Sequence, residues 1–150
     1  MNVAGKKVRV RDRKTSDSVM EIVWGQDEEV VVLDPPAGKI LNIQLFSIET
    51  LDGKHIGLCS LYNQTLTDVQ FGIRIGDKDY WNGGYGTDAV RVLVNYCFAT
   101  MDVERIWLKV LPWNFRAIKC YKRCKFVRTG WLALDGHNFV VMERRRDNDH

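Results

Sequence analysis

The feature that most constrains the fold is a glycine-rich run, Trp81-Asn82-Gly83-Gly84-Tyr85-Gly86-Thr87-Asp88-Ala89, between a strand-like segment and a long amphipathic helix. A strand that ends in such a turn and then opens a helix leaves several backbone N–H groups without partners at the helix N-terminus. With the helix dipole, these groups form a cradle for a phosphate. Glycine turns also close helices onto strands for purely steric reasons, so the turn alone leaves both interpretations open.

Size and composition favour a single domain over residues 1–150. A chain of 150 residues, of which 45% are hydrophobic, can bury one proper core. Its 22 basic and 19 acidic residues are spread through the sequence, so the mild excess of positive charge does not require a nucleic acid partner. The N-terminus interleaves basic residues with valines, and no apolar stretch approaches membrane-spanning length. We therefore expect a cytoplasmic protein with no membrane partner.

The cysteines and histidines are too scattered to predict a metal site. Cys120 and Cys124 have helical spacing, but no nearby histidine completes a zinc site, and the chain has no CxxC pair. We expect reduced thiols that fill the apolar interior, as free cysteines commonly do. The cysteines concerned are Cys59, Cys97, Cys120 and Cys124.

The N-terminal half predicts one helix followed by an antiparallel meander. Valines alternate with basic residues at the start, which is typical of a half-buried strand. Ser16 or Asp17 can cap the following helix, and Asp52-Gly53 suits a tight hairpin turn. The residues expected on the buried face of the helix are Val19, Met20, Val23 and Trp24. The predicted elements are a strand from Lys7 to Arg11, a helix from Asp12 to Gln26, a short element and a loop from Asp27 to Lys39, and strands from Ile40 to Thr50, Lys54 to Tyr62 and Val69 to Ile75.

The C-terminal half predicts two helices and three strands. Asn114 can cap the second helix, and Pro112 ends the strand before it because proline cannot donate to a ladder. The predicted elements are a helix from Thr87 to Met101, a strand from Arg105 to Val110, a helix from Asn114 to Arg123, and strands from Val127 to Leu134 and Asn138 to Arg144. The fold class is α+β, a mostly antiparallel central sheet flanked by helices in the order β-α-(short)-β-β-β-α-β-α-β-β.

A second cluster follows the glycine turn and consists of Asn114-Phe115-Arg116-Ala117-Ile118, Tyr121 and Phe126. The two clusters together resemble the GNAT superfamily of acyl-CoA N-acetyltransferases. The pyrophosphate loop of that family, Gln/Arg-x-x-Gly-x-Gly/Ala, corresponds to residues 81–86. Its later motif, Asn-x-Arg-Ala-x-x-x-Tyr ending in Phe, corresponds to Asn114, Arg116, Ala117, Tyr121 and Phe126. Two details look most like the branch that acetylates ribosomal-protein N-termini, which also has many relatives that act on small amines. These are the tryptophan at the first loop position and the sequence Asn-Phe-Arg-Ala-Ile.

The resemblance implies acetyl-CoA as cosubstrate. Gly84 and Gly86 permit close backbone approach, and the N–H groups from Gly84 to Asp88 suit a diphosphate. In the family, the strand before the loop and the strand after the helix splay apart, and the pantetheine arm pairs with main chain in the gap. Asn114 also suits a plain helix cap, and the basic residues of its helix also suit a solvated face. The residues implied in cofactor binding are Ile73, Arg74, Ile75, Trp81, Gly83, Gly84, Tyr85, Gly86, Thr87, Asp88, Asn114, Arg116, Ala117 and Lys119.

Tyr121 is the residue that the resemblance implies as the catalytic general acid. Acetyl transfer from a thioester expels a thiolate, and a phenol with a reference pKa near 10 stays protonated at neutral pH. It can therefore protonate or stabilise the leaving sulfur. The alternative is a core tyrosine on the buried face of its helix.

The general base is not identified by the sequence. Relatives often have a glutamate near the third central strand, where this chain has Gln70, which cannot accept a proton. Asp68, Glu49, Asp79 and His137 are candidates by position only, and a water chain to solvent would serve an α-amine.

Two further residues depart from the family pattern. Gly83 stands where many relatives have a basic residue, which makes diphosphate binding more dependent on the backbone. Lys125 stands where a glycine usually precedes Phe126, at a helix end where a left-handed residue is favoured.

These residues predict an acetyl-CoA-dependent N-acetyltransferase that acts on a primary amine, a protein N-terminus or a small molecule, by direct attack in a ternary complex. The alternative is a module that binds an acyl-CoA without catalysis, as a sensor or interaction domain, and Gln70 motivates it. A nucleotide-binding protein is weaker, because the Gly-Lys-Ser/Thr of a P-loop is absent. Exposed strands near the end of the chain, such as Phe139 to Met142, could pair between subunits as a homodimer.

Overall fold

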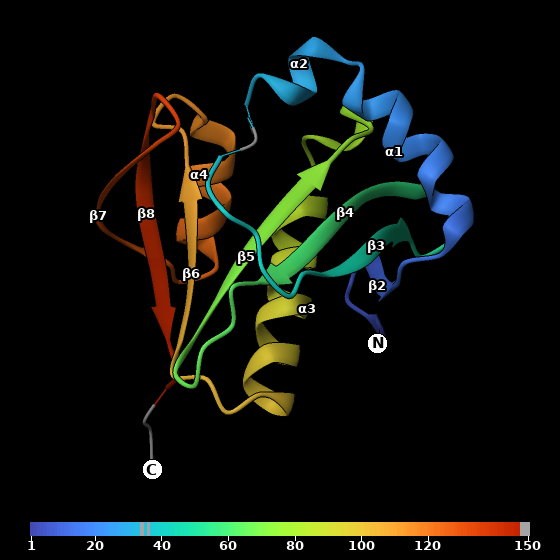
Figure 1. The fold of residues 1–150 in the computed structure, drawn as a ribbon. Coiled ribbons are helices and arrows are strands. Elements are labelled where there is room, and N and C mark those ends of the chain that lie inside the picture. The colour runs from blue at the N-terminus through green and yellow to red at the C-terminus, as the bar shows by residue number, and fades with distance from the viewer. Residues whose placement is uncertain (34, 36, 148–150) are drawn as a thin grey trace.

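One mixed sheet of eight strands organises the molecule. The computed structural model describes residues 1–33, 35 and 37–147. The strand order is β1-β2-β3-β4-β5-β6-β8-β7, and β5 and β6 form the parallel pair among otherwise antiparallel neighbours (Figure 1). The strands are β1 (Asn2–Ala4), β2 (Val8–Asp12), β3 (Gln44–Thr50), β4 (His55–Tyr62), β5 (Asp68–Ile75), β6 (Arg105–Val110), β7 (Val127–Leu134) and β8 (His137–Arg145). The helices are η1 (Thr15–Asp17), α1 (Ser18–Gly25), α2 (Glu28–Val31), η2 (Lys78–Tyr80), α3 (Tyr85–Thr100) and α4 (Phe115–Arg123).

The predicted fold class and element order are confirmed, and the differences lie at the N-terminal side. Strand β1 is an addition, and the long helix predicted from Asp12 is divided between the end of β2, η1 and α1. The predicted strand from Ile40 begins only at Gln44. Asp34 and Pro36 of the predicted loop lie outside the described residues. None of the helices in the described ranges is long and apolar enough to cross a membrane.

Helix α3 supplies the main apolar contact with the sheet. The sequence predicts an apolar stripe of seven residues on this helix, and five of them are buried in the core while Phe98 and Met101 pack against it partly buried. The five buried residues are Ala89, Val90, Leu93, Val94 and Cys97. Burial of aliphatic side chains of this size contributes about 1.5–3 kcal/mol each before entropy is counted. This packing fixes the first turn of α3, and with it the glycine turn, against β5.

Strands β5 and β6 pair over only a short length and then diverge. Their register joins Asp68, Val69 and Gln70 to residues 105–107, and no pairing continues beyond Gln70. From there β5 pairs only with β4, and β6 only with β8. Figure 1 shows the gap widening toward the end of the sheet over which α2 lies. The splay that the family resemblance implied is therefore present.

Helix α1 does not bury the face that the sequence predicted. Trp24 is buried, but Val19 is 65% exposed, Val23 is 51% exposed and Met20 is 37% exposed. The prediction of a four-residue buried stripe is wrong, because of these four residues only Trp24, in the last turn of α1, is buried. There Trp24 packs on Gly76, where any Cβ would collide with the indole ring.

Charged side chains anchor the start of α1 instead. Both oxygens of the buried Asp17 accept hydrogen bonds from the guanidinium of Arg11, at 2.9 Å each. The Ser47 hydroxyl and the Lys14 amide also donate to this carboxylate, at 2.6 and 2.8 Å. Asp17, the last residue of η1 and the N-cap of α1, thus binds the N-cap amide of η1 and one residue from each of two strands. The Arg11 guanidinium holds the pKa of this carboxyl well below its usual range, with help from Ser47.

The predicted intersubunit edge at Phe139 to Met142 is also wrong. Strand β8 lies between β6 and β7, and these four residues are buried. The strand at this edge of the sheet is β7, which covers them.

Candidate cofactor cleft

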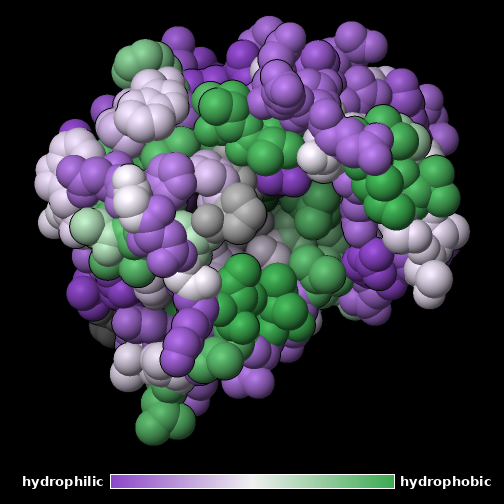
Figure 2. All heavy atoms as spheres, turned by 45° about the horizontal axis from the view of Figure 1, so that its top comes forward, coloured by the Kyte–Doolittle hydropathy of each residue, from purple (hydrophilic) through white to green (hydrophobic). Residues whose placement is uncertain are grey.

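The gap between β5 and β6 is a cavity of about 270 Å³, and it gathers most of the residues that the sequence singled out. The walls come from the end of β5, the glycine turn, the start of α3, the end of β6 and the inner face of α4. Figure 2 looks onto this end of the molecule, where apolar side chains surround a hollow. The predicted residues that line the cavity are Ile73, Arg74, Ile75, Trp81, Gly83, Gly84, Gly86, Thr87, Asn114, Arg116, Ala117, Lys119 and Tyr121.

The glycine turn adopts a backbone that requires glycine. Gly83 and Gly84 have φ values of +99° and +87°, in the left-handed region that other residues rarely adopt. Gly84 is the N-cap of α3. Gly86 lies inside the helix, and a side chain there would meet Ile75 only at an ordinary 3.8 Å. The role of Gly86 is therefore to leave the cavity open.

Gly86 and Thr87, in the first turn of α3, line the cavity. Residues 85–87 open the helix, so their N–H groups have no intrahelical carbonyl to bind. The amide of Asp88 instead donates to the Gly84 carbonyl at 3.0 Å, so the prediction that it is free for an anion is wrong. The Asp88 side chain is also engaged. It accepts the amides of Lys6, Lys7 and Val8 at 3.1, 2.8 and 3.0 Å, which ties the β1–β2 turn to α3.

Trp81 and Arg116 face each other across the mouth of the cavity. The Trp81 indole donates to the Ile75 carbonyl at 2.6 Å, and the Arg116 guanidinium lies 4.2 Å from the centre of the indole ring. One acceptor at the end of β5 is therefore already used, while the strand edge before it has no strand neighbour on the β6 side. The Tyr85 ring lies outside the cavity, edge-on to Tyr80.

The second motif forms helix α4 as predicted. Asn114 is its N-cap and accepts the amide of Ala117 at 3.4 Å, while Asn114 Nδ2 donates to the Leu33 carbonyl at 3.4 Å. After α4, Lys125 adopts φ +69°, so the left-handed turn is kept with a lysine in the glycine position. Arg116 and Lys119 are both exposed on the cavity side of the helix.

Tyr121 belongs to the core and to the cavity wall at once. It is 7% exposed and packs edge-on against Phe71, with ring centres 5.8 Å apart. It also lines the cavity opposite the end of β5. The two alternatives drawn from the sequence, a core tyrosine and a catalytic acid, are thus compatible.

Cys120 is an unexpected member of the cavity wall. The Thr87 hydroxyl donates to its sulfur at 3.4 Å, and the Cys124 thiol donates to the Thr87 carbonyl at 3.5 Å. The neighbouring Cys124 thiol, together with the Thr87 hydroxyl, lowers the pKa of the Cys120 thiol against the opposing effect of burial. The expectation of a plain core thiol holds for the buried Cys124 but not for Cys120.

Gln70, at the position where relatives often have a base, has a structural partner. It is 3% exposed, and its side-chain oxygen accepts from Asn63 at 3.1 Å. Asn63 in turn accepts the Leu41 amide at 2.8 Å. Gln70 therefore secures the chain before β3 rather than facing the cavity.

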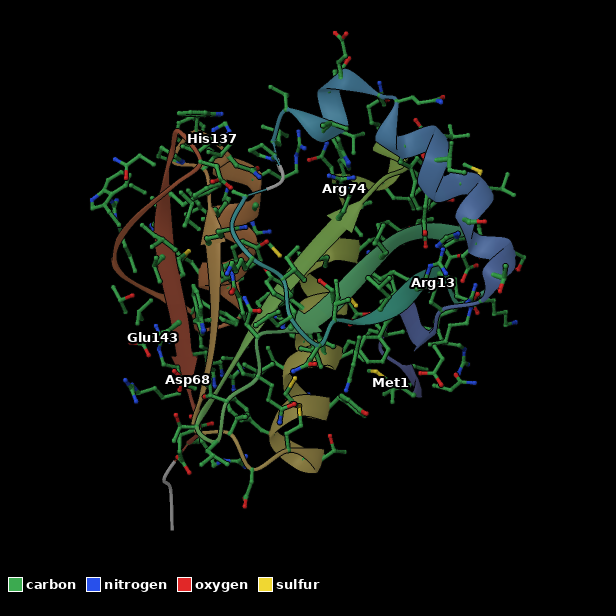
Figure 3. The ribbon with its side chains drawn as sticks, in the orientation of Figure 1. Met1, Arg13, Asp68, Arg74, His137 and Glu143 are labelled. Atoms are coloured by element: carbon green, nitrogen blue, oxygen red, sulfur yellow. The ribbon has the colours of Figure 1, made fainter. Side chains whose placement is uncertain are left out.

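Two of the four positional candidates for the base are engaged elsewhere. Glu49 accepts from Arg11 at 2.8 Å, and Asp68 pairs with Arg105 at 3.3 Å. Figure 3 shows Asp68 at the opposite end of β5 from Arg74. His137 lies at the same end as the cavity mouth and, two residues before Phe139, on the same face of β8.

Several wall residues were not predicted. Phe139, Lys109 and Leu111 come from the strands beyond the gap, and Val30 and Leu33 come from the α2 segment. Strand alternation marks Phe139 as an inward residue, but nothing local indicates that α2 reaches the cavity.

Comparison with known proteins identifies the family to which this geometry corresponds. The model of the acetyltransferase (GNAT) domain matches residues 14–127, which is most of the chain. An uncharacterized N-acetyltransferase, p20, from Bacillus licheniformis is 30% identical over 100 residues, covering 59% of this chain and 56% of that protein. An aminoglycoside N(6')-acetyltransferase type 1 from Klebsiella pneumoniae is 36% identical over 63 residues, covering 42% of this chain and 31% of that protein. The chain thus spans little more than half the length of the first relative and under a third of the second.

Solved structures share the fold over nearly the whole chain. The aminoglycoside acetyltransferase AAC(6')-Ib in complex with coenzyme A has a TM-score of 0.81 at 21% identity, with 93% of this chain and 95% of that chain covered. The ribosomal-protein-S5-alanine acetyltransferase from Vibrio fischeri has a TM-score of 0.80 at 18% identity, with 99% and 98% covered.

Proposed function

The chain belongs to the acetyltransferase (GNAT) family, and we propose that it transfers an acetyl group from acetyl-CoA to a primary amine by direct attack in a ternary complex. One observation carries this proposal: a single cavity connects the open N-terminus of α3 with the buried Tyr121, along a strand edge that no other strand covers. A diphosphate, a pantetheine arm and a thioester need these three environments in that order.

The cofactor is held mainly by backbone in this proposal. The amides of residues 85–87 and the dipole of α3 bind the diphosphate, and the left-handed Gly83 and Gly84 let it approach. The pantetheine amides pair with the free edge of β5 between Ile73 and Ile75. Arg116 and Lys119 supply positive charge from α4, and Asn114 holds the first turn of that helix beside the arm.

Tyr121 acts as the general acid. When the amine attacks the thioester carbonyl, the C–N bond forms, the C–S bond breaks and the sulfur leaves as a thiolate. The phenol protonates or stabilises that sulfur, which is the step a side chain of this acidity can assist at neutral pH. Its ring is held edge-on by Phe71, which fixes the direction of the hydroxyl.

Deprotonation of the amine is assigned to solvent or to His137. The carboxylates of Glu49 and Asp68 are held by arginines, whereas His137 shares the face of β8 that includes the wall residue Phe139. An α-amine has a reference pKa of about 8, so a water chain suffices for that class of acceptor.

The acceptor classes to test come from the relatives: amino sugars, after the aminoglycoside acetyltransferases, and peptide N-termini, after the ribosomal-protein acetyltransferase. Isothermal titration with acetyl-CoA should show binding, and a thiol-release assay over aminoglycosides, alanyl peptides and small amines should show turnover with at least one of them. Absence of acetyl-CoA binding would exclude the proposed function.

A second candidate is a module that binds an acyl-CoA without catalysis. The buried hydrogen bond between Gln70 and Asn63 favours it, because the position used by a base in many relatives is committed to structure. Tight binding of acetyl-CoA with no thiol release for any acceptor would support this candidate.

A further inference from the structure

We propose that Lys7, a residue of the β1–β2 turn, provides a cationic contact for the cofactor diphosphate at the glycine turn. This inference rests on the proposed function, because it assigns a further residue to the same cofactor site. No charged side chain occurs in the glycine turn itself, which is the stretch Asn82-Gly83-Gly84-Tyr85-Gly86-Thr87. A diphosphate bound there meets amides and a helix dipole, but no cation from its own loop.

The β1–β2 turn is fixed directly beside the glycine turn. The amides of Lys6, Lys7 and Val8 all donate to the Asp88 carboxylate, in the first turn of α3. Gly5 closes the turn with a 2.7 Å bond from its amide to the Val8 carbonyl, and a Cβ at Gly5 would collide with the same carboxylate. Residues 80 positions apart in the sequence are therefore held in one rigid arrangement.

The Lys7 side chain extends along the glycine turn from this fixed backbone. Its Nζ lies 5.1 Å from the centre of the Tyr85 ring, and a methyl group at Gly84 would lie 3.8 Å from its Cε. Within the described ranges, no carboxylate forms an ion pair with Lys7. The side chain thus lies beside the N-cap of α3, in a hollow that it shares with Asp52, Tyr80 and Tyr85 and that lies outside the main cavity. Rotation about the terminal bonds of its flexible stem moves the ammonium from the tyrosine ring toward Gly84.

Lys6 provides a matched control on the same turn. It is also exposed, and its amide makes the equivalent bond to Asp88, at 3.1 Å. In the part of the chain that the structure describes, its side chain makes no hydrogen bond, ion pair or ring contact with the glycine turn. A change at Lys6 removes the same charge from the molecule without removing the proposed contact.

The test compares Lys7→Met with Lys6→Met by titration calorimetry against CoA and 3′-dephospho-CoA, which both contain the diphosphate. We expect Lys7→Met to weaken both by about tenfold, which is about 1.4 kcal/mol, because one hydrogen bond from a charged group is lost. Lys6→Met should stay within about twofold of the wild type, as expected for a distant, screened surface charge. With S-acetylpantetheine, which lacks the diphosphate, kcat/KM should be equal for Lys7→Met and the wild type.

Three outcomes would overturn the inference. Equal CoA affinities for the two variants would show that only net charge matters. A loss with CoA but not with dephospho-CoA would assign Lys7 to the 3′-phosphate. An equal loss with S-acetylpantetheine would indicate a general disturbance of the site.

The affinities of the wild type separate this inference from the proposed function. If the wild type bound neither CoA nor dephospho-CoA, the proposed function would fail together with the inference. If the wild type bound both normally and Lys7→Met bound them equally well, the inference alone would fail.

Discussion

The glycine turn and the α1–α2 segment both contribute to the rim of one cavity, but different forces hold them. The glycine turn is set by local backbone conformation, with two consecutive left-handed glycines that lead into α3. The α1–α2 segment is held by side chains from distant strands: Asp17 binds Arg11 and Ser47, and Trp24 packs on Gly76. Between these anchors, α1 leaves its apolar residues in solvent.

The difference shows that the two parts of the cavity wall tolerate substitution in different ways. A site built from backbone amides tolerates substitution of most neighbouring side chains, as long as the glycines remain. A segment held at two points can change the residues between them with little cost in folding. In this molecule, the half of the cavity assigned to the cofactor is built from backbone amides, and the half covered by α2 is formed by a segment that is held at two points.

The largest expected effect breaks the anchor of α1. Asp17→Asn leaves the Arg11 guanidinium without its bidentate partner in a buried site, so the free energy of unfolding should fall by about 3 kcal/mol in urea melts at pH 7. The pKa of Asp17 is depressed in the folded state, so its contribution is complete above the unfolded pKa of about 3.9 and is lost as the pH falls toward the folded value. The difference in unfolding free energy between wild type and variant should therefore begin to narrow below about pH 4 and continue to narrow as the pH falls further.

A control for this prediction is Glu29→Gln, which removes a carboxylate that is 71% exposed and 3.6 Å from Lys78. It should change stability by less than about 0.5 kcal/mol. An equal loss for both variants would contradict the view that burial of the Asp17 pair anchors the segment.

The next effect tests the chemistry at the end of the cofactor half. Tyr121→Phe removes one hydroxyl and keeps the ring against Phe71, so the turnover number should fall by about a hundredfold while the acetyl-CoA affinity stays within about twofold. Steady-state thiol release and titration calorimetry measure the two quantities. Tyr96→Phe, at a half-buried tyrosine that packs on Phe46 outside the cavity, should leave both unchanged. An unchanged turnover in Tyr121→Phe would remove this residue as the acid.

The sequence predicted the cofactor half well because its signals are local. Glycines that need positive φ, a helix cap at Asn114 and apolar residues at helical spacing on α3 are each visible within a few residues. The divergence of β5 and β6 is different: it came from the family resemblance, because no property of either strand alone indicates where pairing stops.

The sequence predicted the α1–α2 half poorly because its contacts are distant. Asp17 looks like a helix cap, and only the fold brings Arg11 and Ser47 to it. The valines of α1 have helical spacing, yet Val19 and Val23 both stay more than half exposed. The partners of Asp88 were also not predicted, although it lies in the cofactor half of the cavity, because they are amides from the distant β1–β2 turn.

A smaller effect separates two glycines of the turn. Gly84→Ala puts a side chain at φ +87°, which should lower stability by about 1 kcal/mol. Gly86→Ala lies in the first turn of α3 with no close contact, so stability should be unchanged or higher by up to about 1 kcal/mol, while the new methyl group narrows the cavity and weakens acetyl-CoA binding. Thermal melts without ligand and calorimetry with acetyl-CoA distinguish the two. A loss of stability in Gly86→Ala equal to that in Gly84→Ala would contradict the backbone account.

The smallest effect concerns the exposed face of α1. The same substitution, valine to alanine, can be compared at an exposed and at a buried position. Val23 in α1 is 51% exposed, and Val90 in α3 is fully buried. Val23→Ala should change the free energy of unfolding by less than about 0.5 kcal/mol, because little area is removed from contact and alanine favours the helix. Val90→Ala should cost about 2 kcal/mol through lost burial and a residual cavity. Urea denaturation of both variants measures the difference. A loss above about 1 kcal/mol in Val23→Ala would mean that this face is covered in solution, and α1 would then be held along its length rather than at its two ends.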